Sequence, residues 1–153
     1  MSWFAAVRAG YGAGLLFAPD LIVTLGTGHR PDPRTTAVAR VLGARHLVQA
    51  AGTAGTPGRA VLALGAEADL VHGASMLLLA AWDRTRARTA RTDAAAALSF
   101  ALAGALLARH APSTPQRPPR GGGVLASAAA WREAAAARLG RWLLPASLRQ
   151  ARD

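Results

Sequence analysis

The sequence predicts an all-α fold, a four-helix transmembrane bundle with a C-terminal amphipathic helix. Four apolar stretches, at residues 3–25, 36–54, 60–82 and 94–108, are separated by short connections rich in Gly, Pro and Arg. Hydrophobic residues make up 52% of the 153 residues and charged residues only 17%, whereas a soluble domain carries about 25% charged residues. Pattern and composition together favour the membrane over the alternative, a soluble bundle of Ala-rich helices.

The four stretches differ in how well they fit a bilayer, which a helix of about 17–25 apolar residues can cross. Residues 36–54 and 60–82 have a suitable length, and residues 94–108 are shorter but uncharged. The first stretch is interrupted by Pro19-Asp20. We therefore expect it to form a short span followed by an interfacial helix from Pro19 to Leu25.

The connections predict how the helices follow one another. The segments GTGHRPDPR (26–34), GTAGTPG (52–58) and DRTRART (83–89) are short and rich in turn formers, which favours antiparallel, up-down-up-down neighbours. Thr92 and Asp93 are expected to cap the fourth helix. The Arg distribution favours only slightly a cytoplasmic side for residues 26–34 and 83–89. The expected location is the cell membrane, multi-pass, with the first stretch retained because Arg8 interrupts it and no basic start precedes it.

The charge and the missing residue types exclude several kinds of chemistry. The net charge is +10, divided evenly between residues 1–111 and 112–153, and aromatic residues make up only 5%. Nucleic acid is therefore not an expected partner. The chain has no Cys, which excludes disulfides, thiolate zinc sites and a catalytic thiol. We find no phosphate-binding loop, HExxH or GxSxG motif, and so predict neither catalytic residues nor a metal site.

The chain divides into a membrane domain (1–111), a Pro/Gly-rich linker (112–123) and a basic helical tail (124–153). In the tail, apolar residues recur at helical spacing and Arg residues flank them. This pattern predicts an interfacial helix on anionic lipid headgroups. A helix that docks on the bundle or on a partner is the alternative. The residues expected at the membrane surface are Trp131, Arg138, Arg141 and Trp142.

Polar residues inside the second and third stretches form the candidate site. Arg45, His46 and Gln49 fall within one arc of about 100° on a helix, and Asp69 and His72 are neighbours one turn apart. Such groups must face protein or water rather than lipid. The turn at 52–58 brings the two helices together, so we expect a buried Arg45–Asp69 pair, with Glu67 as the other possible partner of Arg45. Removing one member would strand the other.

Other interpretations of these residues remain open. His46, Asp69 and His72 are suited to a proton relay, and His46 and His72 could act as axial ligands of a b-type haem. No other cofactor is expected. Gly10 and Gly14 form a GxxxG motif, which predicts close helix packing within the chain or, alternatively, in a homo-oligomer.

The segment LGARHLVQ (42–49), with Asp69, His72, Ser75 and Met76, resembles a group of small four-helix actinobacterial integral membrane proteins of unknown function. The resemblance covers about residues 1–110 and implies a four-helix membrane protein, but no reaction, ligand or site.

The expected function is a non-enzymatic accessory or scaffold role in the lipid bilayer, possible partners being a second copy or another membrane protein. A proton-coupled transporter or channel component is the alternative, and an enzyme with a lipid substrate comes third.

Overall fold

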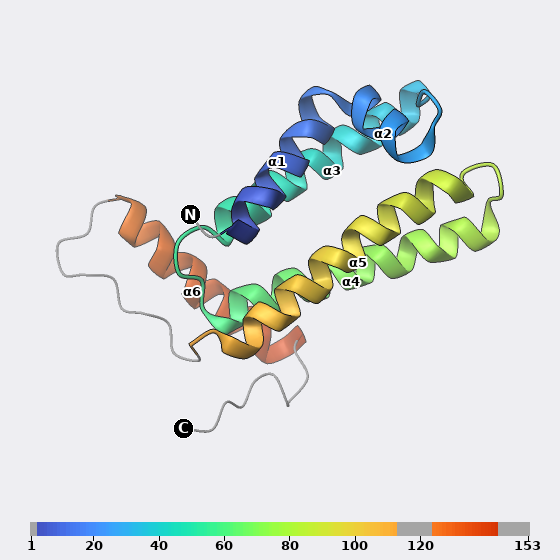
Figure 1. Cartoon of the computed structure of the whole chain (residues 1–153). Coiled ribbons are helices and arrows are strands. Elements are labelled where there is room, and N and C mark those ends of the chain that lie inside the picture. The colour runs from blue at the N-terminus through green and yellow to red at the C-terminus, as the bar shows by residue number, and fades with distance from the viewer. Residues whose placement is uncertain (1–2, 113–123, 144–153) are drawn as a thin grey trace.

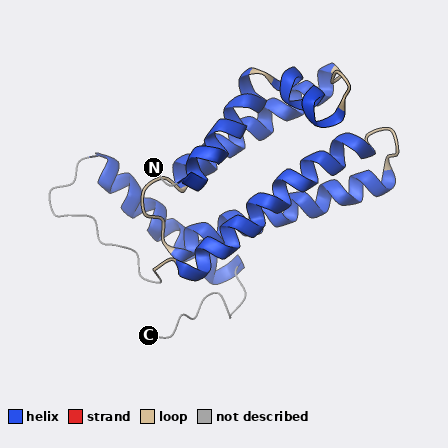
Figure 2. Ribbon diagram, in the orientation of Figure 1, coloured by secondary structure: helices blue, strands red, loops and turns tan. Residues whose placement is uncertain are grey.

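A computed structural model describes residues 3–112 and 124–143, of which residues 124–129 and 140 are described by their backbone alone. Within these residues every regular element is an α-helix (Figure 2), so the all-α expectation is confirmed for the described part of the chain. The helices are α1 (Trp3–Phe17), α2 (Pro19–Thr27), α3 (Pro33–Gly52), α4 (Arg59–Trp82), α5 (Ala87–His110) and α6 (Val124–Leu143).

The helices form two pairs that lie one above the other, with α1 along α3 and α4 along α5 (Figure 1). Close backbone approach occurs mainly within each pair, so the two pairs meet chiefly through side chains. The short helix α2 joins the first pair at one end, where it also contacts α5. At the other end α6 packs against α4.

The break between α1 and α2 confirms the interruption predicted at Pro19-Asp20. The two helices meet at an angle of 105°, and Ala18 between them has the non-helical backbone angles φ −133° and ψ 52°. Proline disfavours the helical conformation of the residue before it, so the chain turns at Ala18 and a new helix starts at Pro19. Gly28 ends α2 in the left-handed conformation, with φ 76°.

The start of α3 is fixed by Asp32 and Pro33. The Asp32 carboxylate accepts hydrogen bonds from the backbone N–H groups of Arg34 (2.8 Å) and Thr35 (3.0 Å), which satisfies two of the free donors at a helix N-terminus. The hydrogen bond from the Thr35 backbone holds the pKa of Asp32 below its ordinary value. Proline at the first helical position adds a suitable φ.

The expected cap of the fourth helix is wrong. The helix α5 begins at Ala87, six residues before Asp93, because Asp83 organises the preceding turn. The Asp83 carboxylate accepts hydrogen bonds from the Thr85 backbone N–H (2.9 Å) and the Thr85 hydroxyl (2.6 Å). Asp93 therefore lies inside α5, where its side chain is available to another helix.

Two described helices, α4 and α5, are long and apolar enough to cross a membrane, and the bent pair α1–α2 passes the same test only when taken together. The helices α4 and α5 have 24 residues each. This corresponds to about 36 Å of helix, which is enough to cross a hydrocarbon core of about 30 Å. The helix α3, which carries Arg34, Arg40 and Arg45, is not among the candidates. The structure thus shows a helical protein with two candidate spans, or three with the bent pair. Four spans remain a prediction.

The helices α1 and α3 approach each other closely at Gly12 and Gly43. A Cβ atom added to Gly43 would lie 2.6 Å from the Gly12 carbonyl oxygen and 2.6 Å from the Leu16 nitrogen. No side chain fits at such distances from backbone atoms. The α4–α5 seam is instead lined by small residues, and its buried alanines are Ala63, Ala66, Ala80, Ala90, Ala94, Ala97, Ala101 and Ala108.

The tail helix α6 docks on the turn between α3 and α4. Glu133 is buried and accepts a hydrogen bond from the backbone N–H of Gly58 (3.0 Å). Arg132 donates to the carbonyl of Ala54 (3.1 Å) and to Glu133 (2.8 Å). One face of α6 is therefore docked on the helices, as in the alternative to an interfacial helix on lipid. The predicted linker 112–123 lies outside the described residues except for Pro112, and so do tail residues 144–153.

Candidate functional site

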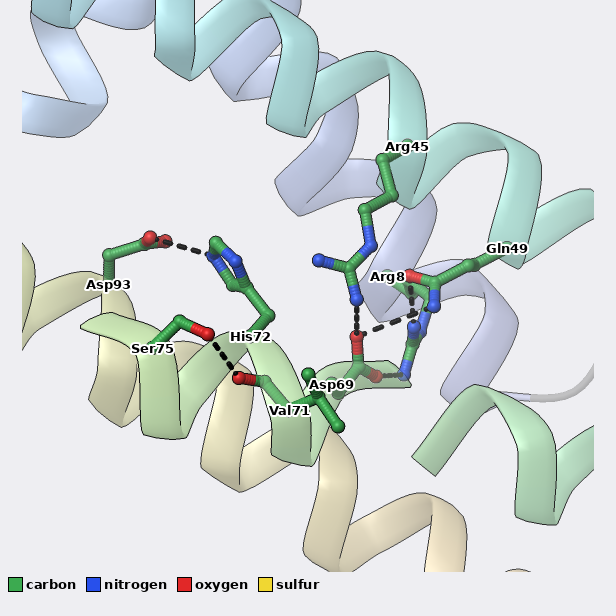
Figure 3. Close-up of polar contacts among 8 residues, drawn as sticks. All are labelled: Arg8, Arg45, Gln49, Asp69, Val71, His72, Ser75 and Asp93. Atoms are coloured by element: carbon green, nitrogen blue, oxygen red, sulfur yellow. Dashed lines mark hydrogen bonds and ion pairs between the residues drawn. The ribbon is translucent and has the colours of Figure 1, made fainter. Parts of the chain in front are cut away.

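The centre of the candidate site is Asp69 on α4, whose side chain is fully buried (Figure 3). One carboxylate oxygen accepts a hydrogen bond from Arg8 on α1 (2.5 Å), and the other accepts one from Arg45 on α3 (3.1 Å). The predicted pair of Arg45 and Asp69 is therefore present. It is the more exposed of the two ion pairs, because the side chain of Arg45 is 29% exposed and that of Arg8 only 1%.

Gln49 links the two arginine contacts. Its side-chain oxygen accepts a hydrogen bond from Arg8 (2.6 Å), and its amide nitrogen lies 3.4 Å from the same Asp69 oxygen that Arg45 contacts. The guanidinium group of Arg8 lies 4.9 Å from the ring centroid of Phe4 and 4.6 Å from that of Phe100, distances at which cation–π attraction is significant. Arg8, Arg45, Gln49 and Asp69 are called the ion cluster below.

Arg8 was missed as a site residue, although one signal pointed to it. It interrupts an apolar helical run, and an arginine in such a run needs a buried partner in the same way as Arg45 does. Its partner Asp69 is 61 residues away. No local spacing rule connects them, because the contact depends on which helix of the first pair faces α4.

His46 lies beside the ion cluster, packed against two aromatic rings. It is buried, and its ring centroid is 5.2 Å from that of Tyr11 and 5.1 Å from that of Phe100. Its Nδ1 atom is buried without a hydrogen-bond partner among the described residues, as is Nε of Arg8. The contacts of His46 therefore place it as a packing residue between α1, α3 and α5.

His72 is paired with Asp93 on α5 and not with Asp69. Its Nε2 atom lies 2.9 Å from a carboxylate oxygen of Asp93, and both side chains are less than one fifth exposed. The contacts of Asp69 and the His72–Asp93 pair are thus separate from each other, as Figure 3 shows. A proton relay through His46, Asp69 and His72 remains a prediction.

Two cavities border these groups, one of about 550 Å³ between the helix pairs and one of about 400 Å³ between α6, α4 and the start of α1. Neither is lined by His46 or His72. These two cavities therefore give the haem alternative no support. In the described part of the chain, no group of three His, Asp or Glu side chains could hold a metal ion.

The remaining predicted residues lie apart from the ion cluster. Gly10 has no neighbour within 4 Å of its added Cβ, and the Cβ of Gly14 would meet Ile22 of α2 at 3.0 Å. The residues of α6 expected at the membrane surface are all exposed, among them Trp131 at 75% and Trp142 at 88%. Leu139, one of the apolar residues that recur at helical spacing in the tail, is exposed with them, whereas the buried face of α6 carries Glu133 and Ala136.

The ion cluster neutralises the buried charge of Asp69 and connects α4 to α1 and α3, since its groups bond to one another. One carboxylate faces two guanidinium groups from two other helices, an arrangement that needs no solvent to satisfy the carboxylate. Comparison with protein-family models, with curated proteins and with solved structures finds no match for this chain.

Proposed function

We propose that the chain is a small integral membrane protein with a non-enzymatic accessory or scaffold role, in which the ion cluster joins the two helix pairs. The observation that carries this proposal is a buried ion pair combined with an apolar surface. Among the described residues, Arg8 and Asp69 are the largest side chains that are fully buried, whereas large apolar side chains such as Val48, Leu78 and Leu102 are exposed by more than 60%.

The exposed surface of α4 and α5 supports a lipid environment in particular. From Ala95 to Leu106 the exposed residues of α5 are all uncharged, and the same holds from Leu70 to Trp82 on α4. In water such a surface would be a large apolar patch of a kind rare in soluble monomers. In a bilayer it is the favourable face.

The helix α3 fits the same proposal despite its arginines. Arg34 lies in the first turn, and Arg40 is exposed within about two turns of the helix start, where a long side chain can reach the headgroups. Arg45, deeper along the helix, bonds to Asp69. On this basis α3 is proposed as a fourth span, in keeping with the resemblance to small four-helix actinobacterial membrane proteins.

Membrane extraction tests the proposed location. After washing with alkaline carbonate and with urea, the chain is expected to stay in the membrane pellet and to enter solution only with detergent. A peripheral protein expressed beside it serves as the control and is expected in the wash. Recovery of this chain in the wash would overturn the integral membrane location and with it the lipid-facing role of Val48, Leu78 and Leu102.

Reconstitution distinguishes the accessory role from the transport alternative. Liposomes that contain the purified chain and a pH-sensitive dye are expected to lose a proton gradient no faster than protein-free liposomes. A faster loss that disappears in His72→Ala would replace the accessory role by proton-coupled transport. His110→Ala is the matched control, because His110 is an exposed histidine at the end of α5.

A further inference from the structure

The cavity of about 550 Å³ between the helix pairs has a charged rim and an apolar interior. It is bounded by α1, α2 and α3 on one side and by α4 and α5 on the other. Its volume falls in the range of about 300–1,000 Å³ that is typical of ligand sites. The apolar side chains that line it are buried or half-buried, except Val38, and include Leu15, Ile22, Leu42, Met76 and Leu79.

The rim lies where the α2–α3 loop and the α4–α5 turn come together. The hydroxyl of Thr92 on α5 donates to the carbonyl of Gly26 on α2 (3.4 Å), and Figure 1 shows both connections at the same end of the molecule. Four exposed arginines line the cavity at this end, two on the connections and two in the first turns of α3 and α5: Arg30, Arg86, Arg34 and Arg88.

Most of these arginines have no acidic partner. Arg86 lies 3.7 Å from Asp83, but Arg30, Arg34 and Arg88 form no ion pair with any residue that the structure describes. The two carboxylates that line the cavity are already engaged, one at the N-terminus of α3 and the other by a histidine. They belong to Asp32 and Asp93.

We propose that this cavity binds an anionic phospholipid, with the phosphate headgroup at the arginines and an acyl chain between the helix pairs. Guanidinium groups pair with phosphate oxygens through two parallel hydrogen bonds, which suits a headgroup at the rim. The apolar walls below suit hydrocarbon and would bind a free phosphate poorly. The proposal rests on the membrane location proposed above.

The test measures phospholipid binding to the purified full chain in detergent by native mass spectrometry. Micelles contain phosphatidylglycerol and phosphatidylcholine in equal amounts, and the ratio of their apparent Kd values is recorded. Phosphatidylglycerol is expected to bind more tightly in the wild type. Each arginine near an anionic lipid contributes about 1 kcal/mol, or a factor of about five in affinity.

The rim is tested by a triple substitution with a matched control. Arg30→Gln/Arg34→Gln/Arg88→Gln is expected to lower the preference for phosphatidylglycerol by tenfold or more, allowing for partial compensation by Arg86. The control, Arg40→Gln/Arg84→Gln/Arg91→Gln, removes the same charge from exposed positions that do not line the cavity. It is expected to keep the preference. Equal losses in both triple variants would mean general surface attraction and would overturn the site.

The interior is tested by filling it. Leu79→Trp places bulk inside the cavity, whereas Leu78→Trp places the same bulk on the neighbouring exposed position. The first variant is expected to lose bound phospholipid and the second to retain it. Retention in both would show that the acyl chain lies elsewhere.

Competition separates the phospholipid from its headgroup alone. Glycerol phosphate, which lacks acyl chains, is expected to displace phosphatidylglycerol only at far higher concentration. Displacement at similar concentration would identify a free phosphate site and overturn the proposal. These binding results are obtained in detergent, so they are independent of the membrane extraction: a chain that resists the carbonate wash but shows no preference for phosphatidylglycerol would refute this inference alone.

Discussion

Asp69 is bonded to two arginines that differ in how much water they meet. Arg8 is almost completely buried against two phenylalanine rings, whereas nearly a third of the Arg45 side chain is exposed. Breaking a buried ion pair by removing one partner leaves an uncompensated charge, which costs more than the net value of the pair itself. Arg8 should therefore matter more to stability than Arg45, although Arg45 was the predicted partner.

A double-mutant cycle tests this ranking. Arg8→Met and Asp69→Leu are each expected to lower the free energy of unfolding by about 3–5 kcal/mol, measured by denaturant titration in mild detergent. The double variant is expected to lose less than the sum of the two single losses, since neither charge is then left alone. A coupling of about 0.5–3 kcal/mol is typical of residues in direct contact.

Two further variants serve as controls for the cycle. Arg45→Met should destabilise less than Arg8→Met because of its exposure, and Arg40→Met, on the outer face of α3, should change stability by less than about 0.5 kcal/mol. Strictly additive losses for Arg8→Met and Asp69→Leu would contradict the direct contact.

The residue types in the site were predictable, but the complete set of contacts was not. Helical spacing placed Arg45 and Gln49 on one face and identified Asp69 as an acid that needs a partner. Spacing along a helix does not say which other helix lies opposite, so Arg8 was not assigned to Asp69. Thr92-Asp93 before an apolar run predicts a helix cap, but α5 begins at Ala87, so Asp93 lies inside the helix and contacts His72.

At the scale of the helices, the contact between α1 and α3 depends on two facing glycines. A Cβ atom at Gly43 would lie as close as 2.6 Å to backbone atoms of α1, which cannot move without shifting the whole helix. Gly10, from the predicted GxxxG motif, has open space around it instead. The motif has the right spacing, but the helix presents Gly12 to its neighbour.

Alanine substitutions distinguish the two glycines. Gly43→Ala is expected to destabilise the protein by about 1–3 kcal/mol through overpacking. Gly10→Ala is the matched control and should be neutral or stabilise by up to about 1 kcal/mol, because alanine is the better helix former. Thermal unfolding of the detergent-solubilised protein measures both. A Gly10→Ala variant that unfolds as early as Gly43→Ala would show that Gly10 lies in a contact, for example with a second copy of the chain.

Element boundaries were predictable where proline, glycine and aspartate fix the backbone. The break before Pro19 is an example, since it follows from the steric effect of a single residue. Whether the second apolar stretch spans the membrane was harder to predict, because α3 has a length suitable for a span but carries three arginines. Whether such a helix crosses a bilayer depends on partners such as Asp69, which the helix alone does not reveal.

At the scale of the whole molecule, the order of the helices in space differs from a simple chain-order bundle. Short turns predicted that each helix would pack on the next, yet α3 packs most closely on α1 and lies in the opposite layer from α4. The short helix α2 makes this possible, because it connects α1 to α3 where the chain reverses direction. It also contacts α5 in the other layer. The two layers are therefore joined at separate points, by the ion cluster and by the contact between α2 and α5.

An engineered disulfide tests the contact between α2 and α5. A Cβ atom built on Gly26 lies 4.0 Å from the Cβ of Thr92, within the range of about 3.5–4.5 Å found in disulfides. The chain has no native Cys, so Gly26→Cys/Thr92→Cys introduces the only thiols. Mild oxidation is expected to remove both maleimide-reactive thiols while the chain stays monomeric on a non-reducing gel. Gly10→Cys/Thr92→Cys should keep both thiols, because no atom lies within 4 Å of a Cβ at Gly10. Two reactive thiols in the first variant would place α2 away from α5 and would separate the two sides of the arginine-lined rim.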